Sequence, residues 1–140
     1  MTAPAVLRVA SLLLASALVI TTGSIAEARS EKTVGWDAAK VYPAAVRFLR
    51  IDVGATVIEK DAEAGYVLFE LREEGRTFRG ALEIVKIDKD GREQVRLVLS
   101  IADRPEYVEV ALLDRLEAKL RSEHGSPRRD APKPGAPAKP

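Results

Sequence analysis

The chain has 140 residues, of which 46% are hydrophobic and 31% charged, so its length and composition fit one globular domain with short appendages. Its 22 basic and 21 acidic residues nearly cancel, and residues 29–125 carry 17 basic against 19 acidic side chains. A folded part with a charge of −2 argues against a nucleic-acid-binding protein. The absence of cysteine excludes disulfide bonds and a lipid anchor on an N-terminal cysteine.

The first 28 residues have the layout of a secretory signal peptide. Arg8 precedes an apolar run over residues 9–20, and Ala26 and Ala28 stand three positions and one position before a cleavage site. We therefore expect cleavage after Ala28 and a periplasmic or secreted protein with no membrane span once the signal is removed. Cleavage after Ala26, and an uncleaved anchor, remain alternatives at this stage.

Residues 29–35 are expected to form a short mobile lead. From Trp36 onward the apolar residues recur at spacings of three and four, which predicts a helix with one apolar stripe: Ala38, Val41, Tyr42, Ala45, Phe48 and Leu49. Pro43 either kinks this helix or begins it. Residues 55–60 then predict a first strand, in which either Val57 or Ile58 faces inward.

Residues 65–102 alternate apolar and polar side chains and predict a three-stranded antiparallel meander. A first turn on Glu74 and Gly75 aligns apolar residues on one face and places Glu70 beside Arg79 on the other. The predicted inner pairs of this hairpin are Leu71 with Phe78, Phe69 with Gly80, and Val67 with Leu82.

A second turn, over residues 88–91, is expected to do the same for the last two strands. It places Glu83 beside Arg96 on the outer face. The predicted inner pairs are Ile84 with Val95, Leu82 with Leu97, and Phe78 with Ile101.

Asp103, Pro105 and Glu106 together predict the start of a second helix, with Asp103 as its capping residue. This leucine-rich helix is expected to end near Gly125. Residues 126–140 contain five prolines and a net charge of +3, so we expect a disordered tail rich in proline, alanine and lysine.

The predicted fold is therefore an α+β domain over residues 36–125: a four-stranded antiparallel meander with an N-terminal and a C-terminal helix packed on one face. Gly80 lies in the middle of that face, where its missing side chain would admit a helix or a ring such as Trp36 or Phe48. This layout resembles small bacterial envelope proteins of uncharacterised function. The resemblance covers residues 36–125 and implies fold and compartment, with no functional residue.

Residues suited to catalysis are few. His124 is the only histidine and is expected at the C-terminal end of a helix, where it would interact with the helix dipole. Asp88, Asp90 and Glu93 around Gly91 could form a reduced calcium loop, although Asp-x-Asp-Gly is also a good hairpin turn. We therefore expect no enzyme, no metal site and no cofactor.

The outer face of the sheet is the candidate binding surface, because both helices are expected on the inner face. The candidate residues on it are Tyr66, Leu68, Arg79, Ala81, Val85, Ile87, Arg96 and Val98. The sequence favours a non-enzymatic interaction module that binds a protein partner or a second copy through this face. The basic tail could also contact anionic envelope polymers weakly. The alternative is a small-ligand-binding domain with a pocket between helices and sheet near Trp36, Tyr42 and Gly80.

Overall fold

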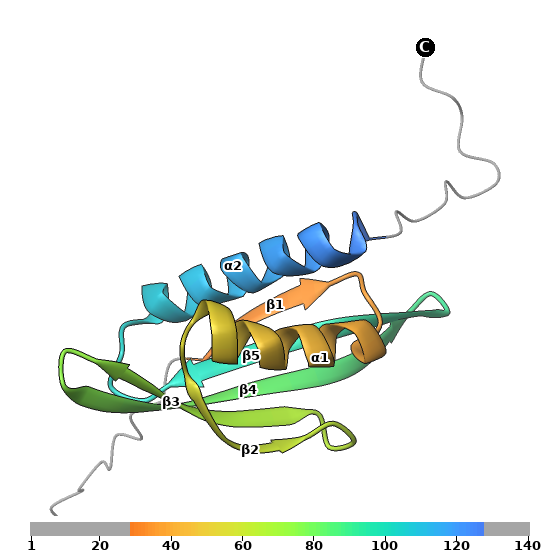
Figure 1. Cartoon of the computed structure of the whole chain (residues 1–140). Coiled ribbons are helices and arrows are strands. Elements are labelled where there is room, and N and C mark those ends of the chain that lie inside the picture. The colour runs from red at the N-terminus through yellow and green to blue at the C-terminus, as the bar shows by residue number, and fades with distance from the viewer. Residues whose placement is uncertain (1–28, 128–140) are drawn as a thin grey trace, which may run out of the picture.

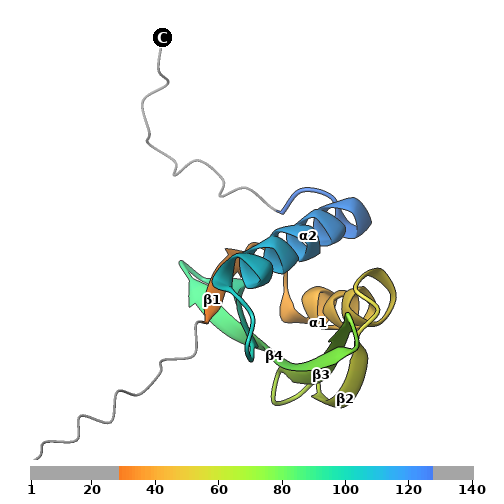
Figure 2. The ribbon, with the colours of Figure 1, turned by 90° about the vertical axis from the view of Figure 1, so that its left-hand side faces the viewer.

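The computed structural model describes residues 29–127, which form an α+β domain with an antiparallel sheet and two helices (Figure 1). The sheet has five strands in the order β1-β5-β4-β3-β2, and α1 and α2 both lie on one face of it (Figure 2). The elements are β1 (Ser30–Val34), α1 (Ala38–Arg47), the π-helical segment Phe48–Asp52, β2 (Thr56–Asp61), β3 (Tyr66–Glu73), β4 (Arg76–Lys89), β5 (Arg92–Ile101) and α2 (Glu106–His124).

The predicted signal peptide, residues 1–28, and most of the predicted tail, residues 128–140, lie outside the described residues. Within residues 29–127, neither helix is long and apolar enough to cross a membrane.

The predicted mobile lead is wrong, because Ser30–Val34 forms the edge strand β1 and raises the number of strands from four to five. β1 pairs with β5, with Ser30 opposite Leu99 and Val34 opposite Val95. Only Val34 is apolar in this strand, so the sequence shows no alternation there. Hydrogen bonds and ion pairs to α2 hold its other inward residues: Ser30 contacts Glu109, and Lys32 pairs with Asp114 at 2.6 Å.

The register of the first hairpin is as predicted. Leu71 lies opposite Phe78, Val67 lies opposite Leu82, and Glu70 lies opposite Arg79. The turn uses Glu74 and Gly75, whose φ angles of 48° and 75° are both positive. Two positive φ angles give a two-residue turn whose twist matches that of the flanking strands.

The register of the second hairpin differs from the prediction by two residues. The chain turns on Asp90 and Gly91, with φ angles of 54° and 78°, instead of over four residues. Leu82 therefore lies opposite Leu99 and Ile84 opposite Leu97, and the predicted outer pair of Glu83 with Arg96 is wrong. Because side chains alternate with a period of two, this shift leaves every residue on its predicted face.

A β-bulge between Val57 and Glu59 settles the register of β2. Val57 packs against the core and Ile58 points outward, with 56% of its surface exposed. Ordinary strand alternation puts Val57 and Ile58 on opposite faces, and the extra residue at the bulge then places Glu59 opposite the outward-facing Leu68.

The start of α1 decides between the two alternatives for Pro43, and the start of α2 differs from expectation. α1 begins at Ala38 and contains Pro43, so the alternative in which Pro43 starts the helix is wrong. Asp103 does not cap α2: it lies in the preceding turn with a φ of 60°, and the helix begins at Glu106. The end of α2 at His124, followed by Gly125 with a φ of 73°, is as predicted.

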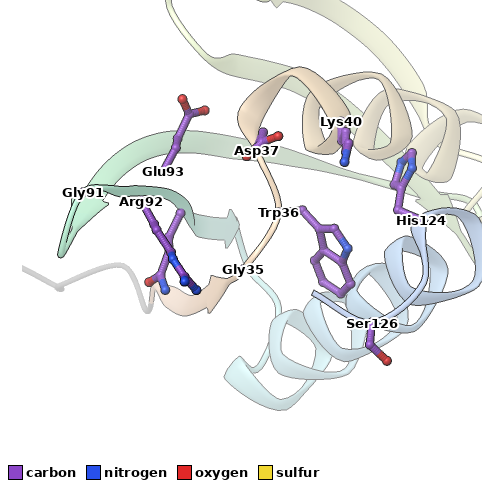
Figure 3. A pocket seen from close by; sticks show the side chains of 10 residues that line it. Gly35, Trp36, Asp37, Lys40, Gly91, Arg92, Glu93, His124 and Ser126 are labelled. Atoms are coloured by element: carbon purple, nitrogen blue, oxygen red, sulfur yellow. The ribbon is translucent and has the colours of Figure 1, made fainter. Parts of the chain in front are cut away.

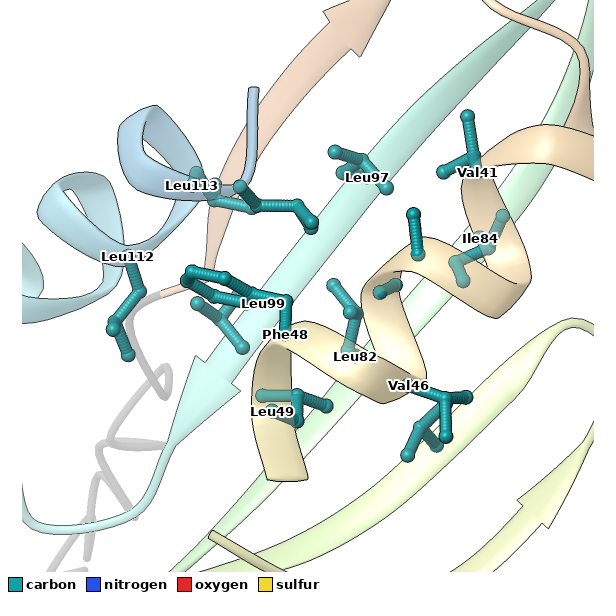
Figure 4. Close-up of a cluster of buried hydrophobic side chains, with 14 of the residues drawn as sticks. Val41, Val46, Phe48, Leu49, Leu82, Ile84, Leu97, Leu99, Leu112 and Leu113 are labelled. Carbon is teal, nitrogen blue, oxygen red and sulfur yellow. The ribbon is translucent and has the colours of Figure 1, made fainter. Parts of the chain in front are cut away.

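The core lies between the two helices and the inner face of the sheet (Figure 4). Leu82 and Leu97 are 1% and 0% exposed, in agreement with their predicted inward direction. Phe69 covers Gly80 on the neighbouring strand, where an added Cβ would lie 2.3 Å from its ring. Gly80 thus admits a ring, as expected, but the ring is that of its cross-strand partner and not Trp36 or Phe48.

Glu109 is the one buried acidic residue among the described residues, and its side chain is fully inaccessible. It lies in the first turn of α2, where the helix dipole favours a negative group. One carboxyl oxygen accepts a hydrogen bond from the hydroxyl of Ser30 at 2.9 Å, and the other accepts one from the backbone N–H of Ile101 at 2.8 Å. A single side chain therefore joins α2 to β1 and to the end of β5.

We expect Glu109→Ala to lower the free energy of unfolding by about 2 to 5 kcal/mol, because it leaves the Ser30 hydroxyl and the Ile101 amide buried without an acceptor. Glu109→Gln should lower the free energy of unfolding by less than half of this amount. The amide oxygen of the glutamine can still accept a hydrogen bond from the Ile101 N–H, and its NH₂ group can donate one to the Ser30 hydroxyl. Urea unfolding measures both. The exposed neighbour Glu106, changed to Gln, is the control and should stay within about 0.5 kcal/mol. An unchanged unfolding midpoint for Glu109→Ala would contradict the role of this side chain.

Candidate functional site

The outer face of the sheet carries all eight residues that the sequence singled out. Leu68 lies opposite Ala81, and Val85 lies opposite Arg96, so their side chains share one face. Phe69 and Leu82, one position along from Leu68 and Ala81, are buried under the helices. Because both helices lie on that inner side, no helix of residues 29–127 covers the outer face (Figure 2).

Three of the eight residues gather in one depression of about 530 Å³ on this face: Leu68, Arg79 and Ala81. Ile58 from β2 closes one side of it. Ser100, at the end of β5, lies opposite Ala81 and closes the other side. The floor of the depression is the backbone of the sheet near Gly80, so the surface there is shallow and mostly apolar.

Two charged side chains stand at the rim of the depression. Arg79 approaches the carboxylate of Glu70 at 3.8 Å, and the side chain of Arg79 is 85% exposed. An ion pair of this length and exposure contributes little to stability. Arg79 is therefore able to turn toward a carboxylate on another molecule at small energetic loss.

The remaining five predicted residues lie on the same face but outside the depression: Tyr66, Val85, Ile87, Arg96 and Val98. Val98 is only 7% exposed, because its neighbours shield it, so it offers little surface to a partner. Tyr66 donates a hydrogen bond to Glu59 on β2. This hydrogen bond and desolvation raise the pKa of Tyr66, so its hydroxyl remains a donor throughout the neutral pH range.

Sequence reasoning missed Ile58, which is the most exposed apolar residue of the depression. The register of β2 could not be read because Val57 and Ile58 are both apolar and no alternation distinguishes them. The pairing of Val57 with the inward-facing Phe69 on β3 separates them, and this pairing leaves no mark in the sequence of residues 56–61.

A second cavity, of about 440 Å³, lies at the opposite end of the sheet from the Glu74–Gly75 turn (Figure 3). The loop before α1, the β4–β5 hairpin and the end of α2 line it. The lining residues include Trp36, Asp37, Lys40, Arg92, Glu93 and His124. Glu93 accepts a hydrogen bond from the backbone N–H of Ala38 at 2.9 Å, so it caps α1 from the neighbouring strand.

The candidate calcium loop is a hairpin turn in the structure. The carboxylate of Asp88 accepts a hydrogen bond from the Gly91 N–H at 3.0 Å, and Glu93 is engaged at α1. Across the part of the chain that is described, no group of three or more His, Cys, Asp or Glu residues is arranged to hold a metal ion. His124 lies at the C-terminal end of α2, as predicted, 3.9 Å from Glu123.

Two arginines near the first hairpin make contacts within the domain. Arg104 pairs with Glu73 at 2.5 Å, and its guanidinium lies 4.8 Å from the centre of the Phe78 ring. Arg76 lies 5.1 Å from the centre of the same ring. These contacts hold the guanidinium groups of Arg76 and Arg104 against the same aromatic ring.

No protein-family model and no curated protein sequence matches this chain. Among solved structures, it is similar to DynU16, a protein of the dynemicin biosynthetic locus, with 14% identity and a TM-score of 0.48 over 71% of this chain and 48% of that one. It is also similar to TTHA0849 from Thermus thermophilus, with 12% identity and a TM-score of 0.42 over 69% and 97% of the two chains. A third is CV1439 from Chromobacterium violaceum, with 12% identity and a TM-score of 0.41 over 70% and 96%. The chain thus spans about half the length of DynU16.

Proposed function

We propose that this protein is a non-enzymatic interaction module that associates with a second copy of itself through the outer face of its sheet. The observation that carries the proposal is the apolar depression around Ile58, Leu68 and Ala81, which neither helix covers. An apolar patch with charged groups at its edge is typical of interaction surfaces.

A second copy suits this face better than a partner of one charge sign. The outer face carries acidic side chains on four strands, such as Glu59, Glu70 and Glu83, and the basic side chains of Arg79 and Arg96 among them. A two-fold interface brings the same patch of both subunits together, so the patch must be complementary to itself. A surface with both signs of charge around an apolar centre meets this requirement, with Arg79 of one copy reaching a carboxylate of the other.

The test is a double variant, Ile58→Lys with Leu68→Lys. Both side chains are exposed, at 56% and 36%, so the fold should survive while the added positive charges repel each other across the two-fold axis. In light scattering, wild-type protein should show a mass above that of the monomer that falls on dilution. The double variant should be monomeric at every concentration and retain the thermal midpoint of the wild type within a few degrees.

The matched control is the double variant Ile51→Lys with Val110→Lys. These side chains are also apolar and exposed, at 75% and 44%, but they belong to the helical side of the molecule. This control should associate like the wild type. A wild-type protein that stays monomeric at all concentrations, or a control that dissociates equally, would contradict the proposal.

The proposal includes a periplasmic or secreted location in a bacterial envelope. It is supported by the signal-like residues 1–28 and by the absence of cysteine, since a domain without thiols is unaffected by an oxidising compartment. The basic tail would add weak, salt-dependent contacts with anionic envelope polymers.

An export assay tests the location. Residues 1–35 fused to a reporter that is active only outside the cytoplasm should give activity, and the recovered protein should begin at Arg29. A fusion in which Arg8 and the apolar residues 12–14 are replaced by Asp should be inactive, because the changes destroy the signal features. Inactivity of the unaltered fusion would rule out export, and recovery of Met1 in the membrane fraction would indicate an anchor.

A further inference from the structure

The cavity at the end of the sheet contains a buried hydrogen-bond donor without a partner. Trp36 is 4% exposed, and among residues 29–127 no group accepts a hydrogen bond from its indole nitrogen. A buried N–H without an acceptor destabilises a fold by about 1 to 3 kcal/mol, so such donors are rare unless something else binds them. Trp36 lines the cavity, and in Figure 3 the nitrogen side of its ring faces His124.

Other donors lie on the same side of the cavity as the indole nitrogen. Lys40 on α1 and His124 at the end of α2 both line it (Figure 3). Within the described part of the chain no ion pair is formed by Lys40, which lies one turn into α1. Arg92 contributes a further positive charge to the lining.

Within residues 29–127, neither acidic residue of the cavity accepts a hydrogen bond from the Trp36 indole or forms an ion pair with Lys40. Glu93 is already an acceptor for the N–H of Ala38. Asp37 precedes α1, and its side chain makes no capping hydrogen bond to the helix. The N-terminus of α1 itself adds a partial positive charge next to the cavity.

We propose that this cavity binds a small molecule that carries a carboxylate. One carboxylate oxygen accepts the hydrogen bond of the Trp36 indole, and the ammonium group of Lys40 neutralises the charge. The indole nitrogen has almost no exposed surface, so the hydrogen bond to the ligand forms when the side chains around it shift. A volume of about 440 Å³ suits a ligand of small-metabolite size. The site is separate from the outer face, so its failure or success does not bear on self-association.

Trp36 is the only tryptophan of the chain, so its fluorescence reports on the cavity directly. Three probes with similar carbon chains separate the chemistry: butyrate has a carboxylate, 4-aminobutyrate has a carboxylate and an ammonium group, and butylamine has an ammonium group alone. Butyrate and 4-aminobutyrate should change the emission of Trp36 in a saturable way at constant ionic strength, and butylamine should not. Binding of butylamine as tight as that of butyrate, or no saturable change with any probe, would overturn the proposal.

Two variants test the named residues, with calorimetry as the readout. Lys40→Gln and Trp36→Phe should each weaken butyrate binding by about tenfold, because each removes one donor and keeps most of the side-chain volume. Lys60→Gln is the matched control, since Lys60 is an exposed lysine on β2 that does not line the cavity, and it should bind like the wild type. Wild-type affinity in both Lys40→Gln and Trp36→Phe would also overturn the proposal.

Discussion

The buried carboxyl group of Glu109 fixes which side of the sheet the helices occupy. It accepts hydrogen bonds from Ser30 on β1 and from Ile101 at the end of β5, so the first turn of α2 is held against two neighbouring strands. A buried carboxyl group is tolerated only where its oxygens are satisfied, and these two donors exist at one place in the sheet. The requirement thus selects one position for α2 among the many that an apolar stripe alone would allow.

Ion pairs extend this arrangement to the rest of the helical layer. Lys32 on β1 pairs with Asp114, and the hydrogen bonds that its ammonium group donates to Asp114 and Glu117 raise the pKa of Lys32. Arg47 at the end of α1 donates to Glu123 on α2 at 2.7 Å. These contacts connect β1, α1 and α2 on the inner side, and as a consequence neither α1 nor α2 reaches the outer face. The proposed interaction surface follows from the position of the helices.

The sequence predicted the meander well because its turns and its alternation agree. Glu74 with Gly75 determined the register of β3 and β4 residue by residue. The predicted register of the second hairpin was wrong by two residues, because residues 88–91 permit both a four-residue loop and a two-residue turn on Asp90 and Gly91. Because strand side chains alternate with a period of two, a shift of two residues leaves each side chain on its predicted face. The candidate outer-face residues therefore still share one face.

Other features had no local signal. β1 has one apolar residue, Val34, and its pairing depends on β5 and on Glu109, which lie far along the chain. The face to which Ile58 points depends on the pairing of β2 with β3. The hydrogen bond by which Glu93 caps α1 joins residues 55 positions apart in the chain. The sequence near Glu93 therefore indicated only a role in the hairpin turn. Long-range hydrogen bonds of this kind are not visible in the periodicity of any one segment.

The central claim is that the open sheet face, and not the helical layer, is where this protein makes contact with a second copy. The most direct measurement is the dependence of backbone amide chemical shifts on protein concentration, recorded by NMR for the chain from Arg29 onward. The account predicts that the amides of Leu68, Arg79 and Ala81 shift as concentration rises, and that those of Tyr107 and Val110 on α2 do not. Shifts confined to α2, or none at all, would contradict it.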